Sequence, residues 1–414
     1  MTDRLKPRGA KEVEEALRWA LDQEKALDII GAGSKRAVGR PSQTDITLDL
    51  SGLSGVTLYE PEELVLSALA GTPVAEVESL VDSKGQMLAF EPMDLGPVLG
   101  GPAGQGTIGG MLAANLSGPR RIKAGAARDH FLGFSAVTGR GETIKSGGRV
   151  VKNVTGYDLC KLLAGSWGTL SVMTEVTLKV MPKPEAERTL LLRGLDDAAA
   201  NKAMTAALGS PFDVSGAAHL PTSAFRTEIE GLGDIAGQSE ALTVLRLEGI
   251  TASAAHRAGS LRELLAPFGT ATLVEDTVSA ALWTTIRDVL PFAADGALGA
   301  WPVWRIVCPP ASGAALGTLL ARETGGELIY DWGGGLIWAA VPPKPDAHAT
   351  AVRERVNAAG GHATLIRAAE DIRRAIDVFH PQAPGLAALS ERVRASFDPK
   401  TILNRGRLTR GVAA

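Results

Sequence analysis

Cysteine is nearly absent from this chain of 414 residues, which contains only Cys160 and Cys308. Two cysteines cannot build a disulfide framework, and they are too few to ligate a metal ion or an iron–sulfur cluster within this chain. Histidine is also scarce, and none of the 6 histidines has a second one at the i, i+4 or short-turn spacing of a metal-ligand pair. We therefore predict no metal site.

An excess of charge and long apolar runs are missing as well. Lys plus Arg number 43 against 46 for Asp plus Glu, so the net charge is −3. This balance gives no reason to expect nucleic acid or a basic membrane-binding patch. The charged segment 1–15 lacks the apolar core of a signal peptide, and no apolar run approaches the roughly 18 residues of a membrane helix. We predict a cytoplasmic protein that reaches a membrane, if at all, through a partner.

Glycine, in contrast, is concentrated in two loops. The segment 104–118 is a glycine-dense turn that runs into a short apolar stretch, and Gly31 to Lys35 follow a predicted strand at 27–30. Glycines permit positive φ and close backbone approach, so that main-chain N–H groups can face a phosphate. The loop at 31–35 also offers a hydroxyl in Ser34 and a cation in Lys35, but its sequence is neither a Walker A loop nor the dinucleotide-binding motif G-x-G-x-x-G.

Four further distinctive runs follow these loops along the chain, namely Gly118-Pro119-Arg120-Arg121, Arg128 to Gly133, Lys152 to Asp158 and Gly165 to Leu170. The whole pattern resembles the FAD-binding domain of the vanillyl-alcohol oxidase / p-cresol methylhydroxylase superfamily. Within that superfamily the chain is most similar to the FAD-binding accessory subunits of bacterial glycolate oxidase.

The resemblance implies an α+β fold. It predicts a two-subdomain FAD-binding domain of the p-cresol methylhydroxylase type at 1–184, an α+β cap domain with an antiparallel sheet at 185–375, and a C-terminal segment at 376–414 that returns to the first domain. The prolines of Val180-Met181-Pro182-Lys183-Pro184 support the first boundary. The ending 398–408 is similar to the close of flavin-linked oxidases, although Arg405 stands where the family usually has proline.

The resemblance also implies a function. It predicts an FAD-dependent oxidoreductase, one subunit of a complex that oxidises glycolate, a small 2-hydroxy acid, to glyoxylate and passes electrons on. The expected partners are a larger FAD-linked catalytic subunit and an iron–sulfur subunit. Relatives with covalent flavin often carry histidine at position 34, so Ser34 predicts non-covalent FAD. The predicted cofactor-binding residues are Gly31, Ala32, Gly33, Ser34, Lys35, Thr107, Ile108, Gly109, Gly110, Asn115, Ser117 and Gly118.

Two other functions stay open. One is an autonomous FAD-dependent oxidase or dehydrogenase of a small hydroxy acid or alcohol, which the missing histidine motif of such relatives argues against. The other is a structural subunit that has lost FAD, which the retained glycines argue against.

Three residues are candidates for catalysis. Arg305 stands alone among apolar residues of a predicted strand at 301–307, on the same face as Val303 and Val307, where it could contact a carboxylate or a partner. An edge-strand arginine that reaches water is the alternative. His130 and Tyr157 could act as acid or base, and both also fit ordinary packing.

Two side-chain groups admit a structural and a functional interpretation. The basic residues 120, 121, 123 and 128 predict a solvated surface, with a subunit contact or attraction of an anionic substrate as the alternative. Strands at 328–332 and 336–341 flank three glycines and predict a hairpin. Period two places its Tyr330, Trp332 and Trp338 on one face, either as core or as a face that closes over the flavin.

Overall fold

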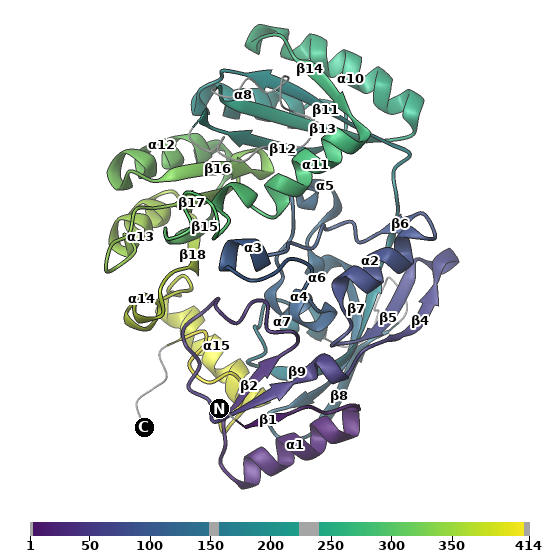
Figure 1. Ribbon diagram of the computed structural model, residues 1–414, viewed down its shortest axis with the longest axis vertical. Helices are drawn as coiled ribbons and strands as arrows, with labels where there is room; N and C mark the ends of the chain where they lie inside the picture. Colours follow the sequence, from purple (N-terminus) through teal and green to yellow (C-terminus); the bar gives the residue numbers. More distant parts are fainter. Residues whose placement is uncertain (1–2, 149–156, 223–239, 410–414) are drawn as a thin grey trace.

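The computed structural model describes residues 3–148, 157–222 and 240–409. Two lobes share these residues: the N-terminal half forms one, and a large sheet with its helices forms the other (Figure 1). None of the described helices is both long and apolar enough to span a membrane.

The first lobe begins with a small parallel sheet. Its strand order is β1-β3-β2, and helix α1 packs beside it through Val13, Leu17 and Ala20, which repeat at helical spacing and are buried. The elements are β1 (Arg4–Leu5), α1 (Ala10–Asp22), β2 (Leu27–Ile30) and β3 (Ile46–Asp49).

An antiparallel sheet of order β4-β5-β9-β7-β8 forms the second part of this lobe. Short helices cover it and enclose a core that includes Phe90, Met111 and Phe131. The strands are β4 (Val56–Glu60), β5 (Val65–Leu69), β7 (Phe131–Thr138), β8 (Thr143–Gly147) and β9 (Ser171–Lys179), with the pair β6 (Gln86–Met87) and β10 (Met181–Pro182) beside them. The helices are α2 (Val74–Asp82), α3 (Gly96–Leu99), α4 (Ile108–Ala114), α5 (Arg121–Ala124), α6 (Ala127–His130) and α7 (Leu159–Leu163).

The second lobe is built on an antiparallel sheet of order β14-β11-β13-β12-β16-β17-β15-β18. The strands are β11 (Ala186–Arg193), β12 (Val214–Leu220), β13 (Leu242–Gly249), β14 (Thr272–Glu275), β15 (Val303–Val307), β16 (Glu327–Asp331), β17 (Leu336–Ala340) and β18 (His362–Arg367). The helices are α8 (Asp197–Leu208), α10 (Thr251–Leu265), α11 (Asp276–Arg287), α12 (Gly313–Thr324), α13 (Ala349–Ala358) and α14 (Glu370–Ala375). The predicted antiparallel cap is confirmed.

The two faces of this sheet bury different surfaces. Helices α8, α10, α12 and α13 cover the outer face (Figure 1). The inner face packs with α11 against the first lobe, in one apolar cluster that joins Trp332 and Trp338 of the cap to Ala114 and Leu116 of the glycine-rich segment. Any group held between the lobes therefore meets the inner face of the sheet.

The hairpin prediction needs one correction. Strands β16 and β17 pair as expected, but Tyr330 lies opposite Ile337 and packs in the outer cluster, whereas Trp338 lies opposite Ile329 and packs in the inner one. Tyr330 and Trp338 are therefore on opposite faces. The interpretation of these aromatics as core is correct, since all three are buried.

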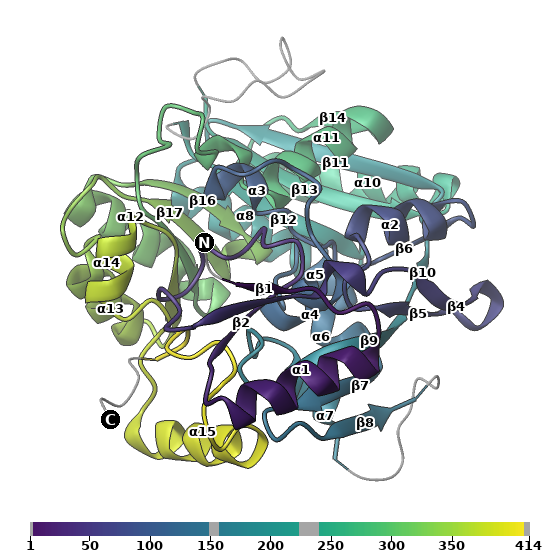
Figure 2. The same ribbon diagram turned by 60° about the horizontal axis from the view of Figure 1, so that its bottom comes forward.

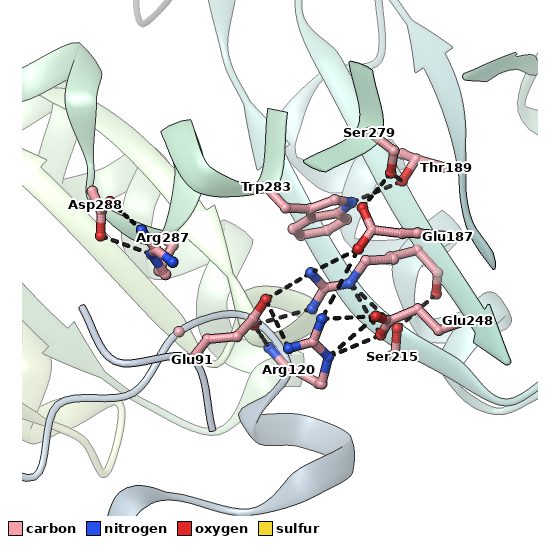
Figure 3. Close-up of polar contacts among 12 residues, drawn as sticks. Glu91, Arg120, Glu187, Thr189, Ser215, Glu248, Ser279, Trp283, Arg287 and Asp288 are labelled. Atoms are coloured by element: carbon pink, nitrogen blue, oxygen red, sulfur yellow. Dashed lines mark hydrogen bonds and ion pairs between the residues drawn. The ribbon is translucent and has the colours of Figure 1, made fainter. Parts of the chain in front are cut away.

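The basic run is corrected at Arg120. Its guanidinium lies in a buried ion network between the lobes, where it bonds Glu248 at 2.7 Å and approaches Glu91 at 3.2 Å (Figure 3). Arg246, from β13, is only 1% exposed and bonds Glu91 at 2.8 Å. This network attaches the cap to the first lobe, so Arg120 is not a solvated surface residue.

The C-terminal segment comes back to the first lobe. After helix α15 (Pro384–Phe397), Leu403 forms a parallel bridge with Leu27, and Asp398 accepts hydrogen bonds from the backbone N–H groups of Ile402 and Leu403. Figure 2 shows α15 on the same side of the molecule as α1 and α7. The exact domain bounds 1–184, 185–375 and 376–414 stay predictions.

Candidate functional site

A cleft in the first lobe encloses about 700 Å³ of space, part of which is open to solvent. Its walls come mainly from the end of β2 with the loop 31–36, from Thr107 with helix α4, from the turn at 167–168 with the start of β9, and from Arg407 in the C-terminal segment. Leu50 and Ala70 also line it. The cleft therefore gathers both glycine-rich loops at one place.

Close contact between those two loops explains why glycine is needed. A Cβ added to Gly31 would lie 2.1 Å from Oγ1 of Thr107, a distance at which something must move. At Gly109 an added Cβ would meet the Ala70 carbonyl oxygen at 2.9 Å. The space beside Gly109 is therefore filled by protein. Gly31 thus lets its loop lie against the Thr107 side chain, and Gly109 lets the start of α4 lie against Ala70.

Cations are the main charged groups of the cleft. Lys35 carries its ammonium in the cleft wall, where burial lowers its pKa and Asp94 opposes that shift. Among the described residues Lys35 forms no ion pair within 4.0 Å. Asp94 itself accepts a hydrogen bond from the backbone N–H of Gly104 at 2.6 Å, which fixes the start of the second glycine-rich loop.

Arg407 supplies a second cation that the sequence interpretation missed. It is 5% exposed, donates from Nη2 to the Lys35 carbonyl at 2.8 Å, and stacks with its Cζ 5.4 Å from the Trp167 ring. Its Nε is buried without a hydrogen-bond partner among the described residues. Burial lowers the pKa of Arg407 to about 10, with Asp28 opposing, so it is charged at neutral pH. A buried donor without a partner, beside Lys35, fits an anionic ligand such as a diphosphate.

Residues 4–147 match a known protein family, the FAD binding domain family. Glycolate oxidase subunit GlcE of Escherichia coli is 33% identical over 396 residues, which is 95% of this chain and 95% of that protein. The chain belongs to the GlcE family.

A second curated relative matches part of this GlcE-family chain, and two solved structures match nearly all of it. Glycolate oxidase subunit GlcD of Bacillus subtilis is 30% identical over 188 residues, 45% of this chain and 38% of that protein. Among solved structures, p-cresol methylhydroxylase superposes with a TM-score of 0.68 at 12% identity, covering 98% of this chain and 88% of that one. An alkyldihydroxyacetonephosphate synthase superposes with the same TM-score at 16% identity, over 97% of this chain and 75% of that one.

These matches confirm several predictions. The fold is the predicted p-cresol methylhydroxylase type with a cap, FAD is the cofactor of the matched domain, and the chain falls in a family of FAD-linked oxidoreductases. Non-covalent attachment and the individual site residues are tested by none of them and stay predictions.

Most of the predicted cofactor-binding residues line the cleft. Gly31, Ala32, Gly33, Ser34, Lys35, Thr107, Gly109 and Gly110 do so. The remaining residues have other places in the structure. Ile108 is fully buried in the core, Asn115 accepts a hydrogen bond from the Arg128 N–H, and Ser117 accepts one from the Ala127 N–H. Gly118 lies at the lobe interface, where its carbonyl accepts from Nε1 of Trp332 at 3.1 Å.

None of the three catalytic candidates, His130, Tyr157 and Arg305, is among the residues that line the cleft. His130 is buried against Phe90, and its Nε2 is 2.9 Å from the Ala124 carbonyl oxygen. Burial lowers the pKa of His130, so the ring is neutral at pH 7. Tyr157 is 89% exposed. Most of the run 152–158, to which Tyr157 belongs, lies outside the described residues.

The structure contradicts the edge-strand interpretation of Arg305, whereas its contact with a carboxylate or a partner stays a prediction. Strand β15 pairs with β17 on one side and β18 on the other, so Arg305 is not on an edge strand. It lies opposite Trp338 and projects with Val303 to the inner face of the sheet, as period two predicts. Its Nε is buried and has no hydrogen-bond partner among the described residues.

Proposed function

We propose that this chain is the FAD-binding subunit of a glycolate oxidase and works in a complex with a larger FAD-linked catalytic subunit and an iron–sulfur subunit. One observation carries the proposal. The similarity to GlcE extends over 95% of both chains and so includes the cap, whereas the similarity to GlcD covers 45% of this chain. Both relatives are named as subunits of a glycolate oxidase, which supports assembly with other chains.

The cleft is the proposed place of FAD. Bound FAD supplies hydride and electron chemistry, while the protein contributes binding, orientation and electrostatics. The backbones of the two glycine-rich loops and the cations of Lys35 and Arg407 suit the anionic part of the cofactor. In the loop beside Lys35, Ser34 offers a hydroxyl, which is consistent with cofactor held without a covalent bond.

The proposed iron–sulfur subunit follows from what this chain can contribute itself. Cys160 and Cys308 are both buried, and burial raises the pKa of each thiol to about 11. Iron–sulfur clusters are held mainly by cysteine thiolates, and the usual clusters need four of them. In this proposal the cluster therefore resides on another chain, and electrons leave this flavin toward a partner.

The test compares the isolated chain with the complex. Both are purified with FAD, their flavin content is measured, and glycolate oxidation is followed with an artificial electron acceptor. We expect the isolated chain to retain FAD and to turn over glycolate slowly or not at all, and the co-expressed complex to be active.

Two results would contradict the proposal. Rapid glycolate oxidation by the isolated, FAD-loaded chain would identify an autonomous enzyme. Full activity of a complex whose copy of this chain cannot hold FAD, because Gly31 is replaced by valine, would identify a structural subunit. Gly259→Ala, in helix α10 where an added Cβ meets nothing within 4 Å, is the matched control.

A further inference from the structure

Arg305 and Arg121 approach the same indole ring from two different lobes. Arg305 extends from β15 of the cap and places its Cζ 5.1 Å from the Trp332 ring centre. Arg121 begins α5 of the first lobe and places its Cζ 4.2 Å from the same centre. Trp332 is buried, and its Nε1 donates to the carbonyl of Gly118 at the end of the second glycine-rich loop. Both guanidinium groups thus lie beside one indole ring where the cap touches the FAD-binding domain.

Neither of these arginines has a carboxylate bound to it. Within the described residues, no ion pair shorter than 4.0 Å involves Arg305 or Arg121, and Nε of Arg305 is buried without a hydrogen bond. Asp331 is the acidic residue that attracts Arg305, but burial raises the pKa of this carboxyl to about 7, and its Oδ1 accepts from the Trp332 N–H.

Arg246, on the same sheet, has the carboxylate partners that Arg305 lacks among the described residues. It stacks over Trp283 of the same inner apolar cluster, and it bonds Glu91 through both terminal nitrogens at 2.8 and 3.1 Å. Its Nε lies 3.4 Å from Glu248. A cation removed from water needs such partners, because its lost hydration is otherwise uncompensated. Arg305 lacks an equivalent partner in the described protein.

The two unpaired cations also repel each other. Burial and the charge of Arg121 lower the pKa of Arg305 to about 10, and burial lowers that of Arg121. Burial, followed by these same two arginines, lowers the pKa of His362, which begins the neighbouring strand β18. Arg121 is exposed and Arg305 is half-buried. A negatively charged group that contacts both guanidinium groups would relieve this repulsion and accept the hydrogen bond that Nε of Arg305 lacks in the described part of the chain.

We propose that Arg305 and Arg121 bind the carboxylate of a small organic acid between the cap and the FAD-binding domain. The planar guanidinium fork matches a carboxylate in a bidentate contact. The indoles of Trp332 and Trp338, whose centres lie 5.1 and 6.0 Å from Cζ of Arg305, favour a ligand of few carbons. The inference rests on the proposed function in that glycolate is the acid supplied to this complex. It goes further by placing a carboxylate site on this subunit rather than on its partner alone.

The experiment measures binding to the isolated, FAD-loaded chain, so it does not depend on turnover. Glycolate, oxalate and the neutral analogue glycolamide are titrated by calorimetry and by the change in flavin absorbance. We expect both carboxylates to bind and glycolamide to bind at least tenfold more weakly. Arg305→Gln and Arg121→Gln should each weaken carboxylate binding about tenfold or more, while Arg305→Lys, which keeps the charge without the fork, should fall in between.

The control is Arg262→Gln, an exposed arginine of α10 on the far side of the cap sheet, which should bind carboxylates like the unaltered chain. Flavin content and melting temperature establish that each variant is folded and loaded. Equal carboxylate affinity in Arg305→Gln and the control would overturn the proposal. A second pair of results would also overturn it: the unaltered chain binds no carboxylate, and Arg305→Gln fails to assemble into the complex. The site would then receive an acidic side chain of the partner. In both cases normal FAD content of the unaltered chain and normal activity of the complex that contains it would leave the proposed function standing.

Discussion

Asn404 accepts a hydrogen bond from the backbone N–H of Ile29 at 2.7 Å, although the two residues are 375 positions apart. The Nδ2 of Asn404 donates to the Trp167 carbonyl at 2.7 Å. Ile29 and Trp167 both line the proposed FAD cleft, so one side chain near the end of the chain connects two of its walls. Asn404 has φ 43°, in the left-handed region that asparagine enters more readily than most residues.

We therefore predict that Asn404→Gly weakens FAD binding. Glycine keeps the left-handed backbone available but removes both hydrogen bonds, which leaves the groups on Ile29 and Trp167 unsatisfied at a cost of about 1–3 kcal/mol. The measurement is the dissociation constant for FAD by fluorescence, with the melting temperature of the FAD-free chain beside it. Lys400→Ala, an exposed change in the same segment, is the control. Unchanged FAD affinity in Asn404→Gly would show that the C-terminal segment does not shape the cleft.

Arg407→Gln should release FAD more readily, because it removes a buried cation whose Nε has no partner in the described protein. A charge-assisted hydrogen bond contributes about 1.5–3 kcal/mol, so we expect the dissociation constant to rise about 10- to 150-fold. Arg407→Lys should recover part of the loss. The exposed change Arg392→Gln serves as the control, and equal affinity of all variants would place Arg407 outside the cofactor site.

The contact between Gly31 and Thr107 gives a paired test. Gly31→Ala puts a Cβ 2.1 Å from Oγ1 of Thr107 and should displace the loop and lower FAD content sharply. Thr107→Ala removes that oxygen, so the double variant should hold more FAD than Gly31→Ala alone. The recovery should be partial, because Oγ1 of Thr107 also accepts from the Gly110 N–H and such caps contribute about 1 kcal/mol. A double variant no better than Gly31→Ala would mean that the clash with Thr107 is not the cause.

Non-covalent attachment is tested by acid precipitation of the FAD-loaded chain. Ser34 lines the cleft and presents a hydroxyl rather than an imidazole, so we expect all the flavin in the supernatant. Yellow colour that stays in the washed pellet would contradict the prediction.

The sequence predicted best what depends on neighbouring positions. The face of Arg305 followed correctly from period two, because Val303 and Val307 belong to the same strand. The face of Trp338 did not, because it depends on the register across the hairpin, which sets Trp338 against Ile329 and Tyr330 against Ile337. A shift of one residue in register exchanges the two faces of a strand.

Contacts between segments far apart in the chain were the main feature that the sequence did not predict. Arg120 was interpreted as solvated because its own neighbours are basic, but its carboxylate partner Glu248 is 128 positions away. Arg407 gave no local signal for the cleft, because nothing in a run of C-terminal arginines indicates which one meets the Lys35 loop. The glycine-rich loops were found because each is contiguous and carries its own conformational requirement in its sequence.

The ion network between the lobes predicts a specific response to acid (Figure 3). Burial disfavours the charged form of Glu248, but Arg246 and Arg120 outweigh it and hold the pKa of this carboxyl at about 2. The unfolded value is near 4.3, so the folded state binds its proton at lower pH than the unfolded state. The stability from Glu248, on the order of 3 kcal/mol, is thus complete above about pH 5 and is lost as the pH falls toward 2. Glu91 acts in the same direction, whereas Glu187, whose pKa burial raises, opposes it in part.

We therefore expect Glu248→Gln to lower the melting temperature at pH 7 and to flatten its dependence on pH between 5 and 3. A network that merely fills space would lower the melting temperature equally at every pH. The measurement is a set of thermal scans of both proteins across this range, with the exposed change Glu263→Gln as control. Carboxyls outside the network titrate alike in the two proteins, so the difference between their curves reports Glu248 together with Glu187, whose pKa the Glu248 charge raises. Parallel curves for Glu248→Gln and the unaltered chain would show that this carboxyl is not held ionised by Arg120 and Arg246.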